Sequence, residues 1–354
     1  MECDGWTATE MHWLEFLEEV RAARAIVKTT YAGAWFRGQE HDWNLSPSIL
    51  RYLAKLDHQT AKLQKDISIC EYELQKARAF LKRTGASEDD EVALRFVEEI
   101  KSLRTDLKRL GQFIPKDNRI PGEGRAFVEF RYRSGSHHKS SWQTLAEMQH
   151  YGVPTRLLDW TKSFIHALAF ALRNYAIKLA QKWKKDRYSK TPPQRLQWHE
   201  VIVKHELADK TVVDEMPTIW ILNPYRLAEK AKGANVLWDL TLDPRDDYYK
   251  LYVGDDPDLS RRFDLPVPIL SPWEDQRVAA QRGVFTCHGN DLRSLNEQVG
   301  KKVVIAVHLR PEAAIHGVRF LSEIGALDRF AMFRDRDSLG RKTRDEFLSR
   351  DEHE

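Results

Sequence analysis

The apolar residues between Thr9 and about Lys28 recur at steps of three and four, which is the spacing of one helix face. The positions are Met11, Leu14, Leu17, Val20, Ala23 and Val27. The pattern then changes, because Ala34-Trp-Phe-Arg-Gly38 is a short run of strand formers that stops at a glycine. The chain therefore opens with an amphipathic helix and a short strand.

A second helical pattern runs from Leu63 to Leu110 in a highly charged stretch. Its apolar residues alternate steps of four and three, as in the seam of a coiled coil: Leu63, Ile67, Cys70, Leu74, Ala77 and Leu81, then Phe96, Ile100, Leu103, Leu107 and Leu110. Gly85 suits the end of one helix and Ser87 the start of the next. We expect residues 58–112 to form an inserted antiparallel helical hairpin that binds a partner or packs on the body.

The remaining chain alternates helical and strand-like segments. Ser141 is placed to cap a helix that includes Trp142, Leu145 and Met148; Asp159, Thr161 or Ser163 would begin the next, which includes Phe164, Leu168 and Leu172. Strands are expected at His199–Val203, Thr218–Leu222, Pro268–Leu270, Arg282–Cys287 and Lys302–His308, and a helix near Ala313–Ile324. Phe127–Arg133 fits either type. These elements predict an α+β fold with a mixed or mostly antiparallel sheet, formed by residues 1–57 and 113–345 and followed by a charged tail at 346–354.

Composition and charge limit the class of protein. The 354 residues include 56 Lys plus Arg and 53 Asp plus Glu, a formal net charge of +3, which is not that of an obligate nucleic-acid binder. Three widely separated cysteines argue against a disulfide framework and against a cysteine-based zinc site. The first residues lack the pattern of a signal peptide, and no run of about 18 apolar residues occurs. We therefore expect a cytoplasmic protein that does not enter membranes.

Two arginines are candidates for ligand binding. Arg37 precedes Gly38, where an open backbone would let a ligand approach, and a guanidinium suits phosphate or carboxylate groups. The structural alternative for Arg37 is an ion pair, for example with Asp159. Arg156 is spaced for a local pair with Asp159, although Asp159 would also serve as a helix cap.

Among the histidines, His150 is the best candidate for a general base or a hydrogen-bond donor to a ligand, with a satisfied core histidine as the alternative. His137 and His138 are adjacent, and neighbouring residues rarely bind one ion, so we expect no metal. Cys287 and His288 would point to opposite faces of a strand, which argues against a catalytic pair.

Three motifs resemble the FRG-domain family, which takes its name from an aromatic-Arg-Gly motif. The first is Trp35-Phe-Arg-Gly-Gln39, followed by Trp43, Leu45, Pro47 and Arg51. The second is the long run Gln149-His-Tyr-Gly-Val-Pro-Thr-Arg-Leu-Leu-Asp-Trp-Thr161, preceded by Trp142 and Leu145 and followed by Ala167–Ala171. The third is Gln276–Thr286. The resemblance extends from about Trp35 to Leu321–Arg334 and implies membership of that family, without implying a reaction.

The order of these motifs is also similar to that of ADP-ribosyltransferases, which use NAD. The resemblance implies that Arg37 holds the NAD pyrophosphate, that Thr161 and Ser163 brace the nicotinamide ribose, and that Gln281 lies on the strand that usually carries a carboxylate. Gln281 is not a carboxylate, so either Glu274, Glu147 or Asp159 takes that role or the site binds NAD without turnover.

Two functional hypotheses follow. In the first, the chain is a cytoplasmic, toxin-like ADP-ribosyltransferase that uses NAD as a substrate and modifies a nucleic acid or a protein. Its pocket would be formed by Arg37, Gln39, His150, Thr155, Arg156, Asp159, Thr161, Ser163 and Gln281, with Glu274 as a further candidate. In the second, the same groups bind a phosphate ligand or RNA without catalysis, and the hairpin docks a protein partner. A cleft that joins Arg37, Thr161 and a carboxylate would favour the enzyme.

Overall fold

The structure is a computed structural model, and it describes residues 8–30, 32–84, 91–112, 120–187, 216–239, 248–253, 263–270, 276–326, 339–340 and 343. The expected strand at His199–Val203 and the candidate Glu274 lie outside these residues. In the described part of the chain, no helix combines the length and apolar character needed to cross a membrane.

A seven-stranded sheet with the order β4-β5-β6-β2-β1-β3-β7 forms the centre of the body. The strands are β1 (Trp35–Gln39), β2 (Leu157–Thr161), β3 (Thr218–Leu222), β4 (Trp238–Asp239), β5 (Val267–Leu270), β6 (Gly283–Cys287) and β7 (Val304–His308). Among the strands that the structure describes, β4 and β5 pair in parallel and every other pair is antiparallel. The α+β class with a mixed, mostly antiparallel sheet is therefore confirmed.

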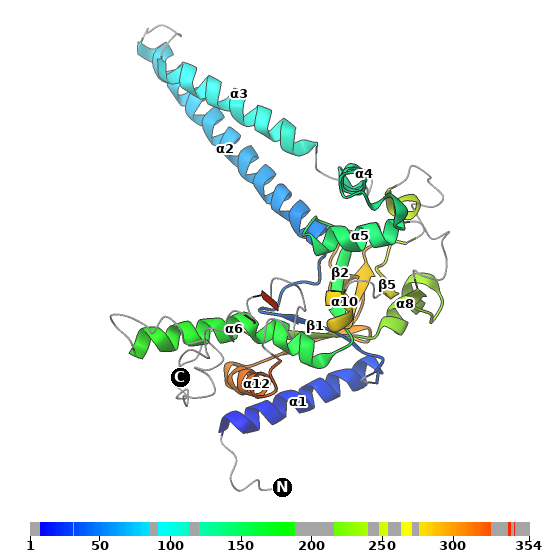
Figure 1. Cartoon of the computed structure of the whole chain (residues 1–354). Helices are drawn as coiled ribbons and strands as arrows, with labels where there is room; N and C mark the ends of the chain where they lie inside the picture. Colours follow the sequence, from blue (N-terminus) through cyan, green and yellow to red (C-terminus); the bar gives the residue numbers. More distant parts are fainter. Residues whose placement is uncertain are drawn as a thin grey trace.

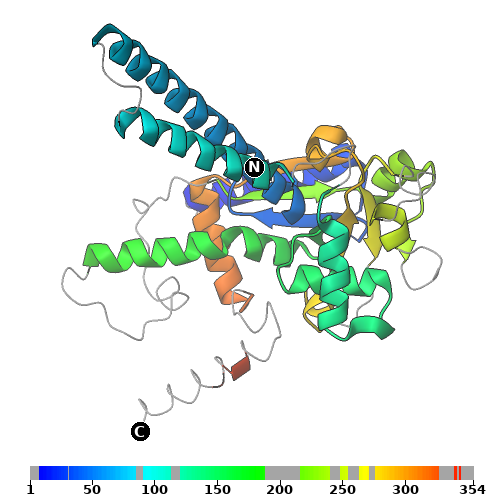
Figure 2. The ribbon, with the colours of Figure 1, turned by 90° about the horizontal axis from the view of Figure 1, so that it is seen from above.

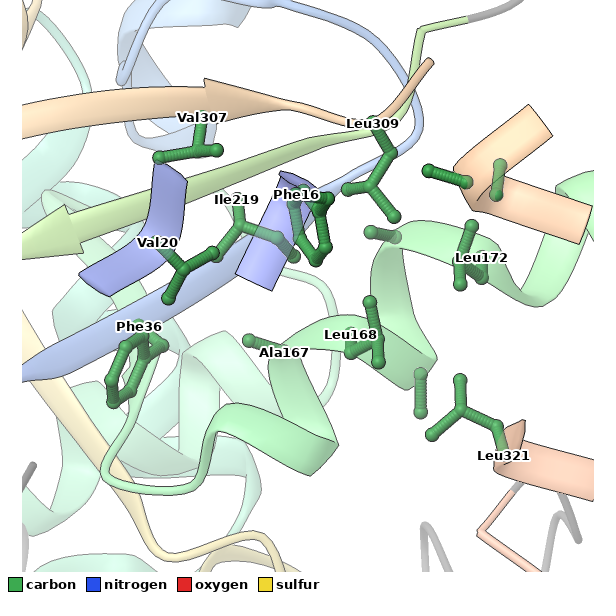
Figure 3. Packing of buried hydrophobic residues seen from close by; sticks show 14 of the residues in the cluster. Phe16, Val20, Phe36, Ala167, Leu168, Leu172, Ile219, Val307, Leu309 and Leu321 are labelled. Atoms are coloured by element: carbon green, nitrogen blue, oxygen red, sulfur yellow. The ribbon is translucent and has the colours of Figure 1, made fainter. Parts of the chain in front are cut away.

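Three helices cover one face of the β1-β3-β7 part of the sheet: α1 (Ala8–Val27), α6 (Phe164–Arg187) and α12 (Pro311–Glu323). The apolar face that the sequence pattern predicts for α1 is only partly correct, because Met11 and Leu14 are exposed. The buried side chains include Val20 and Val27 of that pattern and Phe16, which lies outside it. These side chains pack with Phe36 of β1 and Leu168 of α6 in the core shown in Figure 3. This packing fixes the position of α6 against β1.

Shorter helices complete the body: α4 (Glu123–Arg133), α5 (Ser141–His150), α8 (Pro224–Lys232), α10 (Gln276–Ala280) and α11 (Leu295–Gln298), with single turns η1 (Ser136–His138) and η2 (Tyr249–Val253). Ser140, and not Ser141, caps α5: its hydroxyl accepts a hydrogen bond from the Gln143 N–H, and the Gln143 side chain accepts one from the Ser140 N–H. This capping box fixes the start of the helix that reaches the candidate site.

Two long helices, α2 (Ser48–Thr84) and α3 (Glu91–Gly111), lie side by side and project from the body (Figures 1 and 2). Ile67, Cys70 and Ile100 of the predicted seams are buried, and Arg104 Nη2 lies 2.7 Å from Glu71 Oε1 of the other helix. Coiled-coil packing of the pair stays a prediction. The first helix begins ten residues earlier than the predicted boundary at residue 58, because Ile49 and Leu53 pack into the body with Ile120.

One element that the sequence pattern assigned to a helix start is a strand. The run Leu157–Thr161 forms β2, which pairs along its whole length with β6. Asp159 is therefore not a helix cap; Ser163 begins α6, since its carbonyl accepts the Ala167 N–H and its hydroxyl the His166 N–H. Phe127–Arg133, whose type was open, belongs to helix α4.

Candidate functional site

Strand β1 carries the aromatic-Arg-Gly motif in the middle of the sheet. It pairs with β3 along all of its residues but with β2 only at Phe36 and Thr161. Beyond that pair the ladder does not continue. The guanidinium of Arg37 bonds to β2 instead, since Nη1 donates to the carbonyl oxygen of Asp159 at 2.7 Å. The Arg37 side chain thus connects β1 to β2 beyond the point where the backbone pairing of the two strands ends.

Gly38 has a structural role that differs from the expected one. A Cβ atom at this position would lie 1.8 Å from the carbonyl oxygen of Ala167, so only glycine lets α6 approach β1 this closely. The backbone at Gly38 therefore accommodates α6; Gly38 also lines the pocket described below, so the approach of a ligand at this position stays a prediction. The consequence for the site is that Arg37 is held at a fixed distance from α6.

A pocket of about 330 Å³ lies where β1 and β2 part. The lining residues come from β1, β2, α5, α6, α10 and β6: Phe36, Arg37, Gly38, Ala146, Gln149, His150, Asp159, Trp160, Thr161, Phe170, Val278 and Phe285. Aromatic rings and two opposite charges thus meet in one concave space. Such a combination is typical of a small-molecule site.

Arg37 and Asp159 form a loose pair in this pocket. Arg37 Nη1 lies 3.8 Å from Asp159 Oδ2, and the two side chains are 18% and 55% exposed. Burial lowers the pKa of the Arg37 guanidinium, and the negative charge of Asp159 only partly opposes that effect. Arg37 Nε is buried without a hydrogen-bond partner among the residues that the structure describes. Arg37 therefore keeps donor capacity that an anionic ligand would use.

The orientation of Asp159 depends on Gln149, which lies in the second motif but was not among the predicted site residues. Gln149 Nε2 donates to Asp159 Oδ2 at 2.9 Å, and Thr155 Oγ1 donates to Gln149 Oε1 at 2.6 Å. Thr155 is buried and does not line the pocket, so it acts on the site through Gln149. The sequence signal that would have found Gln149 is its place one residue before His150, on the last turn of α5.

The hydroxyl groups predicted to brace a ribose already have protein partners. Thr161 lines the pocket, where its Oγ1 donates to the carbonyl oxygen of Gln281 at 2.5 Å and accepts the Ser163 N–H at 3.0 Å. Ser163 begins α6 and does not line the pocket. Arg37 and Thr161 therefore line one pocket, whereas Gln281 does not line it and contacts Thr161 through its backbone carbonyl.

Two predicted ligand-binding residues lie elsewhere. The buried side chain of Gln39 accepts a hydrogen bond from Trp220 Nε1 at 2.9 Å. Arg156 is fully buried and does not pair with Asp159: its Nε lies 2.8 and 2.9 Å from the two carboxylate oxygens of Glu123, and its Nη1 donates to the carbonyl oxygen of Gly289. Burial opposes the charge of Arg156, but the adjacent Glu123 carboxylate raises its pKa above the usual value. Both residues stabilise the fold around the pocket.

His150 lines the pocket at the last turn of α5, and its ring contacts that of Tyr151 with centroids 5.0 Å apart. It is exposed, which excludes the alternative of a core histidine. Glu147, the other carboxylate of α5, is tied to Ser136 and Lys139 and does not line the pocket. The side chains considered for the carboxylate role were Glu147, Asp159, Glu274 and Gln281. Among those that the structure describes, only Asp159 lines the pocket.

Comparison with known proteins supports the family. Residues 92–179 match the model of the FRG domain, a stretch that includes α5, β2 and most of α6. The chain therefore contains an FRG domain. The aromatic-Arg-Gly motif of β1 lies outside the matched residues, and the match begins within α3. No curated protein and no solved structure matches the chain.

Proposed function

We propose that the protein is a cytoplasmic ADP-ribosyltransferase-like enzyme that binds NAD as a substrate in the pocket between β1 and β2. The observation that carries the proposal is the meeting of Arg37, which has an unused buried donor among the described residues, with the Asp159 carboxylate inside an aromatic pocket. A guanidinium with a free donor suits a pyrophosphate oxygen. The half-buried ring of Phe170, which lines the pocket, suits a flat heterocycle, whereas the rings of Phe36 and Trp160 are buried in the cores behind it.

The size of the pocket supports binding of one end of the dinucleotide. Its volume of about 330 Å³ is at the lower limit of typical ligand sites, which suits the nicotinamide and its ribose. Phosphate groups would then lie toward Arg37. The two described cysteines, Cys70 and Cys287, are free and buried, which agrees with a reducing compartment.

The side chains of Asp159 and His150 would have distinct roles in the reaction. In ADP-ribosyl transfer, the bond between the ribose carbon and nicotinamide breaks with its electron pair left on nicotinamide, and the ribose carbon bonds to the acceptor, which loses a proton. Positive charge develops on the ribose during this step, and the Asp159 carboxylate would stabilise it. His150, exposed at the pocket, would take the proton from the nucleic acid or protein that acts as acceptor.

The test uses labelled NAD with the protein alone and with candidate acceptors. We expect nicotinamide release or label transfer by the wild type, a loss of about a hundredfold in turnover for Asp159→Asn, and affinity for NAD about tenfold to a hundredfold weaker for Arg37→Ala. The control is Arg226→Ala, because Arg226 also donates to a backbone carbonyl, that of Lys302, but far from the pocket. No transfer, no hydrolysis and no NAD-dependent rise in melting temperature of the wild type would exclude the enzyme.

One observation favours a second candidate, a regulatory module that binds a phosphate ligand or RNA without catalysis. Gln281 is an amide where ADP-ribosyltransferases usually have a carboxylate, and Asp159 Oδ2 already accepts a hydrogen bond from Gln149. In that case the wild type would bind NAD or RNA without turnover, and Arg37→Ala would lose binding while Asp159→Asn would retain it.

A further inference from the structure

The base of the helical hairpin is hydrogen-bonded to the loop between α5 and β2. Ser48 Oγ accepts the Thr155 N–H at 3.1 Å, and the Ile49 N–H donates to the Thr155 carbonyl oxygen at 3.2 Å. Both groups belong to the first turn of α2, where backbone N–H groups have no partner inside the helix. The main chain of Thr155 is therefore held from both its N–H and its C=O by the start of the hairpin.

The side chain of Thr155 continues this connection into the pocket. Its hydroxyl donates to Gln149 Oε1 at 2.6 Å and accepts the Leu157 N–H at 3.1 Å, which fixes the hydroxyl rotor. Because the carbonyl end of the Gln149 amide faces Thr155, its NH2 end must face Asp159 Oδ2, 2.9 Å away. One continuous set of hydrogen bonds thus runs from the first turn of α2 to the pocket carboxylate.

We propose that Ser48, Thr155 and Gln149 are positioning residues through which the hairpin holds the Asp159 carboxylate in place. Ser48 and Thr155 do not line the pocket, so they act on Asp159 only through Gln149. Hydrogen bonds of this kind, behind a functional carboxylate, orient it and affect activity strongly.

The shape of the hairpin gives this path a regulatory consequence. Helix α2 has 37 residues without interruption, so it is about 55 Å long. Its first turns are anchored in the body by Ile49, Leu50 and Leu53, whereas its far end projects away from the body (Figure 1). A protein partner that tilts the hairpin would move Ser48 against Thr155 and so change the orientation of Asp159.

The first readout does not depend on NAD. In protein labelled with 15N at glutamine, the side-chain amide of Gln149, assigned by loss of its signal in Gln149→Asn, reports directly on its two hydrogen bonds. Ser48→Ala and Thr155→Val should shift this resonance and speed the exchange of its protons. The matched controls are Ser68→Ala, on the same helix with its hydroxyl bonded to the Gln64 carbonyl oxygen, and Thr155→Ser, which keeps the hydroxyl. Neither control should alter the signal.

The second readout rests on the proposed function. With NAD as the probe, Ser48→Ala and Thr155→Val should lower kcat about tenfold or more and leave KM nearly unchanged, because a misplaced carboxylate affects the transition state more than binding. Thr155→Ser should restore kcat. A purely structural role of these hydrogen bonds would instead lower the melting temperature of Ser48→Ala and Thr155→Val and leave kcat of the folded protein unchanged.

The two readouts separate the two proposals. An unchanged Gln149 resonance in Ser48→Ala and Thr155→Val would refute the positioning path, whatever the protein does with NAD. If the resonance shifts in these variants but the wild-type protein does not consume NAD, the positioning path is supported and only the proposed reaction is refuted. A shifted resonance with unchanged kcat in an active enzyme would refute the role of the path in positioning Asp159.

Discussion

At Gly38, next to the pocket, the fold leaves no room for a side chain. The contact with the Ala167 carbonyl involves backbone on both sides, so neither partner can move by a rotamer change. Overpacking of this kind costs about 1–3 kcal/mol, and more when backbone must shift. The glycine of the family motif is therefore explained by helix packing, which sets the distance between α6 and Arg37.

We expect Gly38→Ala to lower the free energy of unfolding by about 3 kcal/mol or more, measured by chemical denaturation. Gly300→Ala is the control, because a Cβ at Gly300 meets no atom within 4 Å. Equal stability of the two variants would show that α6 does not approach β1 as closely as described.

The two arginines show what the sequence can and cannot predict at the residue scale. Arg37 and Arg156 both lie in motifs beside aromatic and hydroxyl residues, and the sequence supported a ligand role for each. They differ in their partners: Arg156 has the buried carboxylate of Glu123, 33 positions earlier in the chain, whereas Arg37 donates to the backbone carbonyl of Asp159 and has only a loose contact with its carboxylate. A pairing at that separation leaves no local pattern, so the structure alone distinguishes a structural arginine from a candidate site arginine.

At the scale of elements, the sequence predicted the strands whose residue types match a strand. Strands β3 and β7 were predicted from runs rich in Ile and Val, although β3 is buried at all five positions and shows no alternation. Strand β2 is also largely buried, but it was missed because Leu157-Leu-Asp-Trp-Thr161 contains no Val or Ile. The same residues include Asp and Thr, which favour helix starts. The site could not be placed on a strand for that reason.

The hairpin is the element whose relation to the body is most open to experiment. The match to the FRG domain begins at residue 92 and so includes nearly all of α3. The buried residues of the first turns of α2, in contrast, pack with Ile120 of the body. The distal part makes its hydrophobic contacts mainly between α2 and α3.

Replacing residues 64–109 by a four-residue glycine-serine turn should therefore leave the body folded. We expect the melting temperature to fall by only a few degrees, because Ile49, Leu50, Leu53 and Leu56 remain. Circular dichroism should show loss of helix with the sheet signal retained. An unfolded or insoluble product would mean that the distal hairpin is part of the body's core.

At the scale of the whole molecule, a buried polar cluster connects segments that are far apart in the sequence. Arg156, Glu123 and Tyr248 are joined by hydrogen bonds, and the Arg156 carbonyl oxygen accepts the His288 N–H. Breaking a buried ion pair by removing one partner costs about 3–5 kcal/mol, because the remaining charge is left without compensation. The cluster thus links α4 to the residues next to β2 and β6. These two strands are neighbours in the sheet and are separated from β3 and β7 by β1.

His288 makes this cluster sensitive to acid. Its side chain is fully buried, and burial together with the charge of Arg156 lowers its pKa from 6.5 to about 3, against a weaker opposing effect of Asp291. The unfolded chain therefore binds a proton at this position below about pH 6.5 that the folded chain does not bind. Stability contributed by the neutral imidazole is complete above pH 6.5 and is lost as the pH falls toward the folded pKa.

Between about pH 6.5 and pH 4.5, this single group should lower the free energy of unfolding by about 2 kcal/mol. The measurement is urea denaturation at each pH for the wild type and for His288→Leu, in which that part of the loss should disappear. His138→Leu, at an exposed position, should keep the wild-type pH dependence. The same slope in all three proteins would show that His288 titrates normally in the fold, and that acid acts on the molecule through its carboxylates instead.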